Sequence, residues 1–184
     1  MDIRGKKVLV FGSGISGEGS CRLLLEKGAD VVLYDGNEKL CADEIEAKIL
    51  ETKKENGQFS IVLGTFPEEI IEELSFVVMS PGVPTDLPIV EKMREKSIPI
   101  WGEIELAYVF GKGDVLAITG TNGKTTTTAL LGQIMQDYKE HAYIVGNIGT
   151  PYTSVAQETT VVQQFLQHLR GVPLGKDVDF QLLP

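Results

Sequence analysis

A glycine-rich segment near the N-terminus has the residue types and spacing of a phosphate-binding loop. Gly12-Ser13-Gly14-Ile15-Ser16-Gly17 matches the pattern G-x-G-x-x-G, follows the apolar run 7–11, and precedes a stretch with helical spacing. The glycines permit a tight turn and close approach of a ligand, and the free N–H groups of the helix start attract a phosphate. Asp35, which ends the next apolar run, can accept a hydrogen bond from a ribose hydroxyl or a base. The loop predicts nucleotide binding, for which a nicotinamide or flavin dinucleotide is one interpretation; a turn that only packs a helix on a strand is the alternative.

A second glycine-rich segment, TGTNGKTT at 119–126, carries the Gly-Lys-Thr ending of an ATP-binding loop. In such a loop, Lys124 would neutralise charge on the β- and γ-phosphates and the Thr125 hydroxyl would hold Mg²⁺. The standard spacing places a glycine where this chain has Ile118, so the standard pattern is not met. Threonines are poor helix formers, and four in succession at 125–128 favour a functional use of their hydroxyls; packing and capping is the alternative for the last two.

The elements that must position these loops follow from the hydrophobic pattern. The run 7–11, the helical spacing at 18–27 and the run 31–35 predict a strand–helix–strand unit with parallel strands. Further predicted strands lie at 61–63, 76–79, 98–101 and 115–119, and further predicted helices at 38–56, 67–74, 86–96 and 129–135. We therefore expect an α/β protein: a Rossmann-like parallel-sheet domain at 1–100, a linker at 101–113, and the start of a P-loop ATPase domain at 114–184.

The composition is that of an ordinary globular protein. The chain has 184 residues, 42% of them hydrophobic, and a formal net charge of −9, which disfavours nucleic-acid partners. Its two cysteines do not suggest a zinc site or a disulfide framework. The first ten residues do not read as a signal peptide, and no apolar run approaches the roughly 20 residues of a membrane helix. We expect a cytoplasmic protein with small-molecule ligands.

Several segments together resemble the Mur ligases, which build the peptide stem of bacterial peptidoglycan. TGTNGKTT is similar to the shortened ATP loop of that family, and four other segments agree with the family in order: GSGISG at 12–17, Ser80-Pro81-Gly82, Gly102-Glu103-Ile104-Glu105 and Gly146-Asn147-Ile148-Gly149. The resemblance covers residues 5–158. Within the family the segments are most similar to the member that adds D-glutamate to UDP-N-acetylmuramoyl-L-alanine, with the L-alanine-adding member as the alternative.

The resemblance implies a site residue by residue. The first loop would hold UDP rather than NAD, through Gly14, Ile15 and Ser16 at the diphosphate and uridine, with Asp35, Gly36 and Asn37 at the uracil end. Ser80, Pro81 and Gly82 would lie beneath the sugar and diphosphate, and Asn147 would contact the muramoyl part. ATP and Mg²⁺ would bind Gly120, Thr121, Asn122, Gly123, Lys124, Thr125 and Thr126, with Lys124 as the catalytic residue and Thr125 as a metal ligand.

The implied reaction is ATP-dependent amide formation, in which the substrate carboxylate becomes an acyl phosphate that the amino group of D-glutamate attacks. Family members are more than twice as long and carry a C-terminal domain for the amino acid. We therefore expect this chain to bind the UDP-linked substrate without turning it over alone; a non-catalytic nucleotide-binding module is the alternative. Residues 159–184 do not resemble the family, and their apolar stripe predicts an amphipathic helix at 161–169. An incomplete second domain is expected to be partly ordered or held by another copy of the chain.

Overall fold

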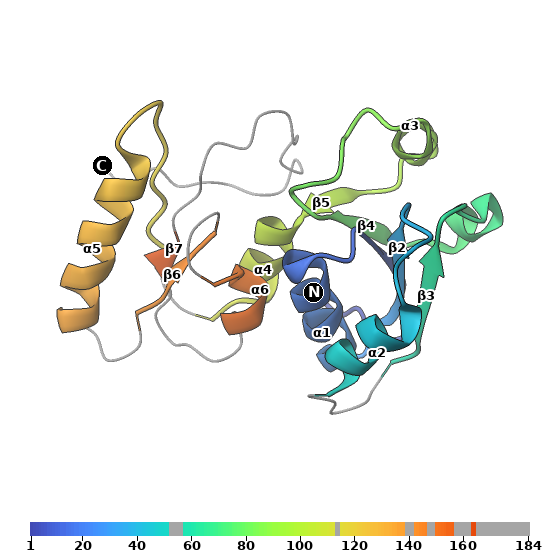
Figure 1. Ribbon diagram of the computed structural model, residues 1–184, viewed down its shortest axis with the longest axis horizontal. Helices are drawn as coiled ribbons and strands as arrows, with labels where there is room; N and C mark the ends of the chain where they lie inside the picture. The colour runs from blue at the N-terminus through green and yellow to red at the C-terminus, as the bar shows by residue number, and fades with distance from the viewer. Residues whose placement is uncertain (52–56, 113–114, 139–141, 147–149, 157–162, 165–184) are drawn as a thin grey trace.

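The structure is a computed structural model that describes residues 1–51, 57–112, 115–138, 142–146, 150–156 and 163–164 (Figure 1). Five described strands form one parallel sheet in the order β3-β2-β1-β4-β5. Their bounds are β1 Lys7–Phe11, β2 Asp30–Asp35, β3 Phe59–Leu63, β4 Phe76–Met79 and β5 Ile100–Gly102. The Rossmann-like α/β fold expected from the sequence is confirmed.

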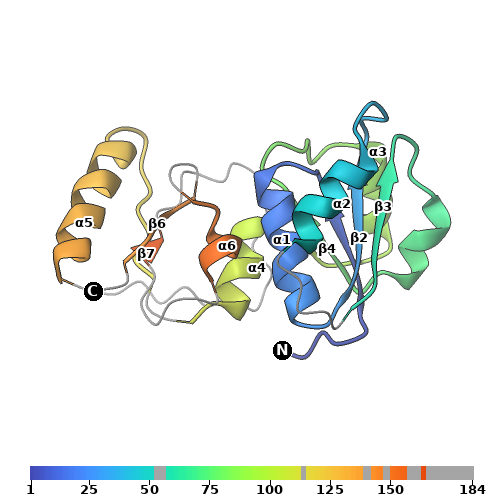
Figure 2. The same ribbon diagram turned by 60° about the horizontal axis from the view of Figure 1, so that its bottom comes forward.

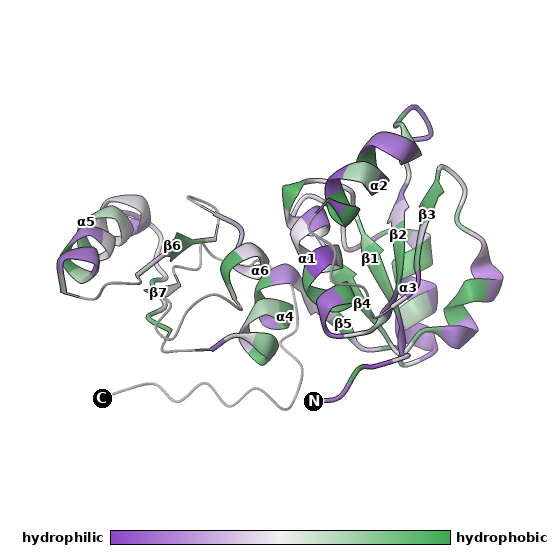
Figure 3. Ribbon diagram, turned by 90° about the horizontal axis from the view of Figure 1, so that it is seen from below, coloured by the Kyte–Doolittle hydropathy of each residue, from purple (hydrophilic) through white to green (hydrophobic). Residues whose placement is uncertain are grey.

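The sheet is covered on both faces, which explains why its central strands are continuously apolar. Val8, Leu9 and Val10 of β1 are all fully buried, as expected for a parallel strand with helices above and below it. Figure 3 shows β1 in the hydrophobic colour, whereas α2 (Ala42–Leu50) presents hydrophilic residues beside hydrophobic ones. Alternate residues of β1 therefore enter two separate cores, one on each face.

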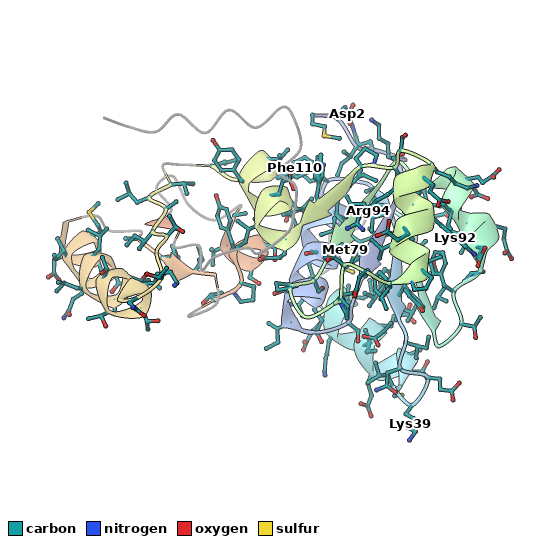
Figure 4. All side chains as sticks on the ribbon, turned by 90° about the horizontal axis from the view of Figure 1, so that it is seen from above. Asp2, Lys39, Met79, Lys92, Arg94 and Phe110 are labelled. Atoms are coloured by element: carbon teal, nitrogen blue, oxygen red, sulfur yellow. The ribbon has the colours of Figure 1, made fainter. Side chains whose placement is uncertain are left out.

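One face packs against α1 (Ile15–Glu26), α2 and α4 (Glu103–Phe110), and the short helix α6 (Tyr152–Val155) packs in turn against α1 and α4, as Figure 2 shows. The other face packs against the 3₁₀ helix η1 (Glu68–Glu73) and α3 (Pro88–Glu95). Figure 4 shows Lys92 between these last two elements, where its ammonium pairs with the carboxylate of Glu68. The core on this face is built from apolar residues of β1 and β4 together with η1 and α3.

The second part of the chain contains α5 (Lys124–Tyr138), β6 (Ile144–Val145) and β7 (Gln163–Gln164), the two strands being paired in parallel. Figures 1 and 2 both show α5 at the far end of the molecule from β3, with α4 and α6 between them. In the part of the chain that the structure describes, no helix combines the length and the apolar character needed to span a membrane.

Three expectations from the sequence differ from the structure. Residues 115–119 form no strand, because a parallel strand needs hydrogen-bonded neighbours and none of the described strands pairs with this segment. Residues 103–110, for which no helix was predicted, form α4, whose residues 103–107 are buried. Gln163 and Gln164 lie in β7 rather than in the predicted helix at 161–169, the rest of which is outside the described residues.

Candidate functional site

A cleft with a volume of about 1110 Å³ opens at the carboxyl ends of the strands. Ligands of open α/β sheets bind at this edge, and the volume suits a ligand of nucleotide-sugar size. The cleft is lined by the loops after β1, β2 and β4, the start of α4, and two residues from the second part of the chain: Phe11, Gly12, Ser13, Gly14, Ile15, Ser16, Tyr34, Asp35, Gly36, Asn37, Ser80, Pro81, Gly82, Val83, Pro84, Leu87, Glu103, Ile104, Gly146 and Pro151.

The three glycines of the first loop are needed for different structural reasons. Gly12 has a φ of +100°, and a Cβ there would lie 2.8 Å from Val83 Cγ2. A Cβ on Gly17 would lie 1.8 Å from the carbonyl oxygen of Gly12, so only glycine lets α1 approach the loop. Gly14 has open space on its Cβ side, and the first turn of α1 has no side-chain cap. Gly12 and Gly17 are thus required by the fold, whereas Gly14 leaves room and helix N–H groups for an anion.

Asp35 holds the first loop in shape. Its Oδ2 accepts hydrogen bonds from the backbone N–H of Ser13 at 2.9 Å and from the Ser13 hydroxyl at 2.6 Å, and its Oδ1 accepts one from the N–H of Asn37 at 3.0 Å. Partial burial raises the pKa of Asp35, but these three hydrogen bonds outweigh it and hold the pKa below the ordinary value. From the sequence we expected this carboxylate to bind only a ligand. Its hydrogen bonds with Ser13 were not predicted, although a serine directly after Gly12 indicated that a donor was nearby.

The remaining residues predicted to bind the UDP part lie around the same cleft. Ile15 begins α1 and is 73% exposed, an uncommon position for a large apolar side chain at the mouth of a polar loop. Ser80 donates from its hydroxyl to the carbonyl of Gly12 at 3.2 Å and so joins the loops after β1 and β4. Asn147, predicted for the muramoyl part, lies outside the described residues, although Gly146 lines the cleft. The roles of these residues towards a ligand stay predictions.

The second glycine-rich loop lies outside this cleft, at the start of α5. Gly120 and Gly123 have positive φ angles of +153° and +76°, which glycine adopts without strain. The Lys124 ammonium donates to the carbonyl oxygens of Gly120 and Thr121, within its own loop. Thr125, Thr126 and Thr127 are exposed, whereas Thr128 is buried, so packing explains only the last of them. Among the described residues no group of three acidic, histidine or cysteine side chains is placed to hold a metal ion.

This loop nevertheless has the donors that a nucleoside triphosphate with Mg²⁺ requires. It offers an ammonium, the N-terminal N–H groups of the 15-residue helix α5, and the exposed hydroxyl of Thr125. Asn122, between the two glycines, is exposed as well. The residues present therefore fit the group that the sequence pattern predicts.

Glu103 is a residue of the cleft to which the sequence interpretation gave no role. Only 3% of it is exposed, and its Oε1 accepts hydrogen bonds from the Thr153 N–H at 2.8 Å and the Thr153 hydroxyl at 2.9 Å. Burial raises the pKa of Glu103, and the hydrogen bonds from Thr153 and from the backbone N–H of Tyr152 oppose that rise without cancelling it. The sequence carried two signals for it: an acidic residue at the start of an apolar stretch, and its place in the segment Gly102-Glu103-Ile104-Glu105 that resembles the family.

Comparison with known proteins identifies the family. Residues 6–102 match the model described as Mur ligase MurD-like, N-terminal domain, and residues 118–173 match the Mur ligase middle domain. The chain belongs to the Mur ligase family. The family resemblance thus extends beyond residue 158, where the sequence interpretation ended it.

The curated relatives described here are named for the same activity. The UDP-N-acetylmuramoylalanine–D-glutamate ligase of Lachnospira eligens is 50% identical over 160 residues, which are 87% of this chain and 34% of that protein. The ligase of the same name from Alkaliphilus oremlandii is 40% identical over 185 aligned positions, covering 98% of this chain and 39% of that protein. This Mur ligase chain therefore spans little more than a third of the length of the curated relatives it matches.

Among solved structures, the chain is similar to a pseudomurein peptide ligase type C from Methanothermus fervidus, with a TM-score of 0.49 and 22% identity. The match covers 89% of this chain and 33% of that one.

Proposed function

We propose that this chain is the part of a D-glutamate-adding Mur ligase that binds the UDP-linked substrate, together with the beginning of its ATP-binding domain. The observation that carries the proposal is the cleft in which the first glycine loop, Asp35–Asn37 and Ser80–Gly82 come together at the carboxyl edge of the sheet. The names of the relatives support the choice of substrate, UDP-N-acetylmuramoyl-L-alanine, and of D-glutamate as the second substrate.

The chemistry of the cleft matches the parts of a uridine diphosphate. Gly14, Ile15 and Ser16 offer space and helix N–H groups to the diphosphate. Asp35 is ionised at neutral pH and can accept from the N3–H of uracil, while the N–H of Gly36 is a donor of the kind that a uracil carbonyl requires. Ser80, Pro81 and Gly82, after β4, lie on the other side of the glycine loop and are assigned to the sugar side of the diphosphate.

The second loop is assigned to ATP and Mg²⁺. The chemistry that ATP supplies when bound is phosphoryl transfer to the terminal carboxylate of the substrate, which prepares that carboxylate for amide formation with D-glutamate. Lys124 would exchange the carbonyls of Gly120 and Thr121 for phosphate oxygens, and the Thr125 hydroxyl would ligate Mg²⁺. Binding and charge neutralisation are the contributions assigned to this chain; the complete reaction is assigned to the whole protein.

A thermal-unfolding titration with four ligands tests the proposal. UDP and UDP-N-acetylmuramoyl-L-alanine are expected to raise the melting temperature, because a ligand at 100 times its dissociation constant adds about 2.7 kcal/mol of stability. NAD is expected to leave it unchanged, and Mg-ATP reports on the second loop separately. A rise with NAD alone would return the first loop to its dinucleotide interpretation and overturn the proposal.

A further inference from the structure

The cleft is not built by the sheet domain alone. Two of its lining residues, Gly146 and Pro151, come from the chain segment after α5, and Pro151 directly precedes α6. Helix α6 packs on the sheet domain rather than on α5: Tyr152, Val155 and Ala156 are buried in the same core as residues of α1 and α4. The wall of the cleft formed by Gly146 and Pro151 is therefore positioned by the docking of α6.

Two hydrogen bonds and two close approaches at glycines hold α6 in place. The Thr153 N–H and hydroxyl both donate to Glu103 at the start of α4. A Cβ on Gly19 of α1 would lie 2.5 Å from the Thr153 hydroxyl oxygen, and a Cβ on Gly111 would lie 2.6 Å from the Tyr152 hydroxyl oxygen. Two glycines thus make room for α6, and Glu103 is the acceptor that determines where its first turn lies.

The position of Glu103 relative to the strands of the sheet indicates which end of the ligand lies near it. Asp35 ends β2 and Glu103 follows β5, and in the sheet β1 and β4 lie between these two strands. Three strand spacings separate them, about 14 Å. With uracil at the β2 side and the diphosphate at the loop after β1, the substituted sugar must extend towards β4, β5 and the wall that α6 holds.

We propose that Glu103 is a positioning residue for the sugar–carboxylate end of the UDP-linked substrate, acting through Thr153 to hold the Gly146 and Pro151 wall in place. The inference rests on the proposed function, because it takes the uridine end as bound near Asp35. It gives a buried acid at the start of α4 a share in substrate recognition, through the segment that α6 holds. The burial of Glu103 and the hydrogen bonds that it accepts from Thr153 and Tyr152 at the start of α6 carry the inference.

Calorimetric titration of the full chain with UDP and with UDP-N-acetylmuramoyl-L-alanine tests it. Glu103→Ala removes the acceptor, and Glu103→Gln keeps one at the same position. We expect Glu103→Ala to bind UDP within about twofold of the unaltered chain and to bind the muramoyl compound at least about tenfold more weakly. Glu103→Gln should restore most of that affinity. Equal losses for both ligands, or none for the muramoyl compound, would overturn the inference.

Amide hydrogen exchange gives a second readout that needs no ligand. In Glu103→Ala, the backbone amides of 152–156 should exchange at least about tenfold faster, while those of β1 keep their protection. Thr153→Val, which removes only the hydroxyl donor, should fall between the unaltered chain and Glu103→Ala. Unchanged exchange at 152–156 would refute the positioning role even if UDP does not bind. Absence of UDP binding by the unaltered chain, with faster exchange in the variant, would refute the proposed function and the ligand assignment of Glu103 with it.

Discussion

Asp35 and Glu103 are two carboxylates of one cleft whose surroundings act on them in opposite directions. Asp35 is partly exposed and receives three hydrogen bonds, so its pKa lies below the ordinary value. Glu103 is almost completely buried, and its pKa lies above the ordinary value even though Thr153 donates to it twice. Three hydrogen bonds lower the pKa of each carboxylate, so the much deeper burial of Glu103 decides the difference in direction.

This difference predicts opposite pH dependences of stability. A carboxyl group whose pKa is lowered by folding stabilises the folded protein at neutral pH, and this effect is lost as the pH falls through the lowered pKa. A carboxyl group whose pKa is raised by folding stabilises the folded protein below its ordinary pKa, and this effect is lost as the pH rises through the raised pKa. Asp35→Asn should therefore lose more stability relative to the unaltered chain at pH 7 than at pH 3. Glu103→Gln should become relatively more stable as pH rises from 4 to 8; Tyr152 stays neutral there, because burial raises its pKa to about 12.

Urea unfolding midpoints at pH 3 to 8 measure both trends, with Glu69→Gln as an exposed control. Parallel curves of stability against pH for Glu103→Gln and the unaltered chain would contradict the raised pKa of Glu103.

At the residue scale the sequence could place Asp35 at the loop, because motif spacing is local. It could not give Glu103 its partner, because Thr153 is 50 residues away in the chain.

At the scale of elements, α1 and its glycine loop separate the needs of folding from those of binding. Gly17→Ala should lower the free energy of unfolding by about 3 kcal/mol, because its Cβ would meet the Gly12 carbonyl oxygen. Gly14→Ala, with open space around its Cβ, should change stability by no more than about 0.5 kcal/mol yet weaken UDP binding. Chemical unfolding and calorimetry measure the two effects. A Gly14→Ala chain that binds UDP normally would show that the diphosphate lies elsewhere.

The elements also show where hydrophobic patterns are informative. The strands 7–11 and 76–79 were predicted with their observed bounds, because a strand buried on both faces leaves a continuous apolar run between polar breaks. The segment 115–119 has the same appearance but no paired neighbour among the described strands. Helix α4 was not predicted because its residues 103–107 are all buried and its exposed residues, Tyr108 and Val109, are not strongly polar, so no polar face marks a period.

For the whole molecule, Tyr152 joins the two parts of the chain. It is 1% exposed, and it is among the largest of the fully buried side chains that the structure describes. Tyr152→Ala should lower the free energy of unfolding by about 3 kcal/mol and the melting temperature by roughly 6–12 °C. Tyr108→Ala, on α4 and 46% exposed, is the matched control and should cost much less. A small loss at Tyr152 would mean that α6 contributes little to cohesion.

The link between Glu103 and Thr153 also has a consequence for synthesis on the ribosome. All five strands of the sheet precede residue 103, whereas the helix that completes the cleft begins at Tyr152. At 5–20 residues per second, the 50 residues from Glu103 to Thr153 take roughly 3–10 s to be translated. During that interval the apolar sides of α1 and α4 that α6 later covers are available to solvent and to chaperones, and the cleft of the nascent chain lacks the wall formed by Gly146 and Pro151.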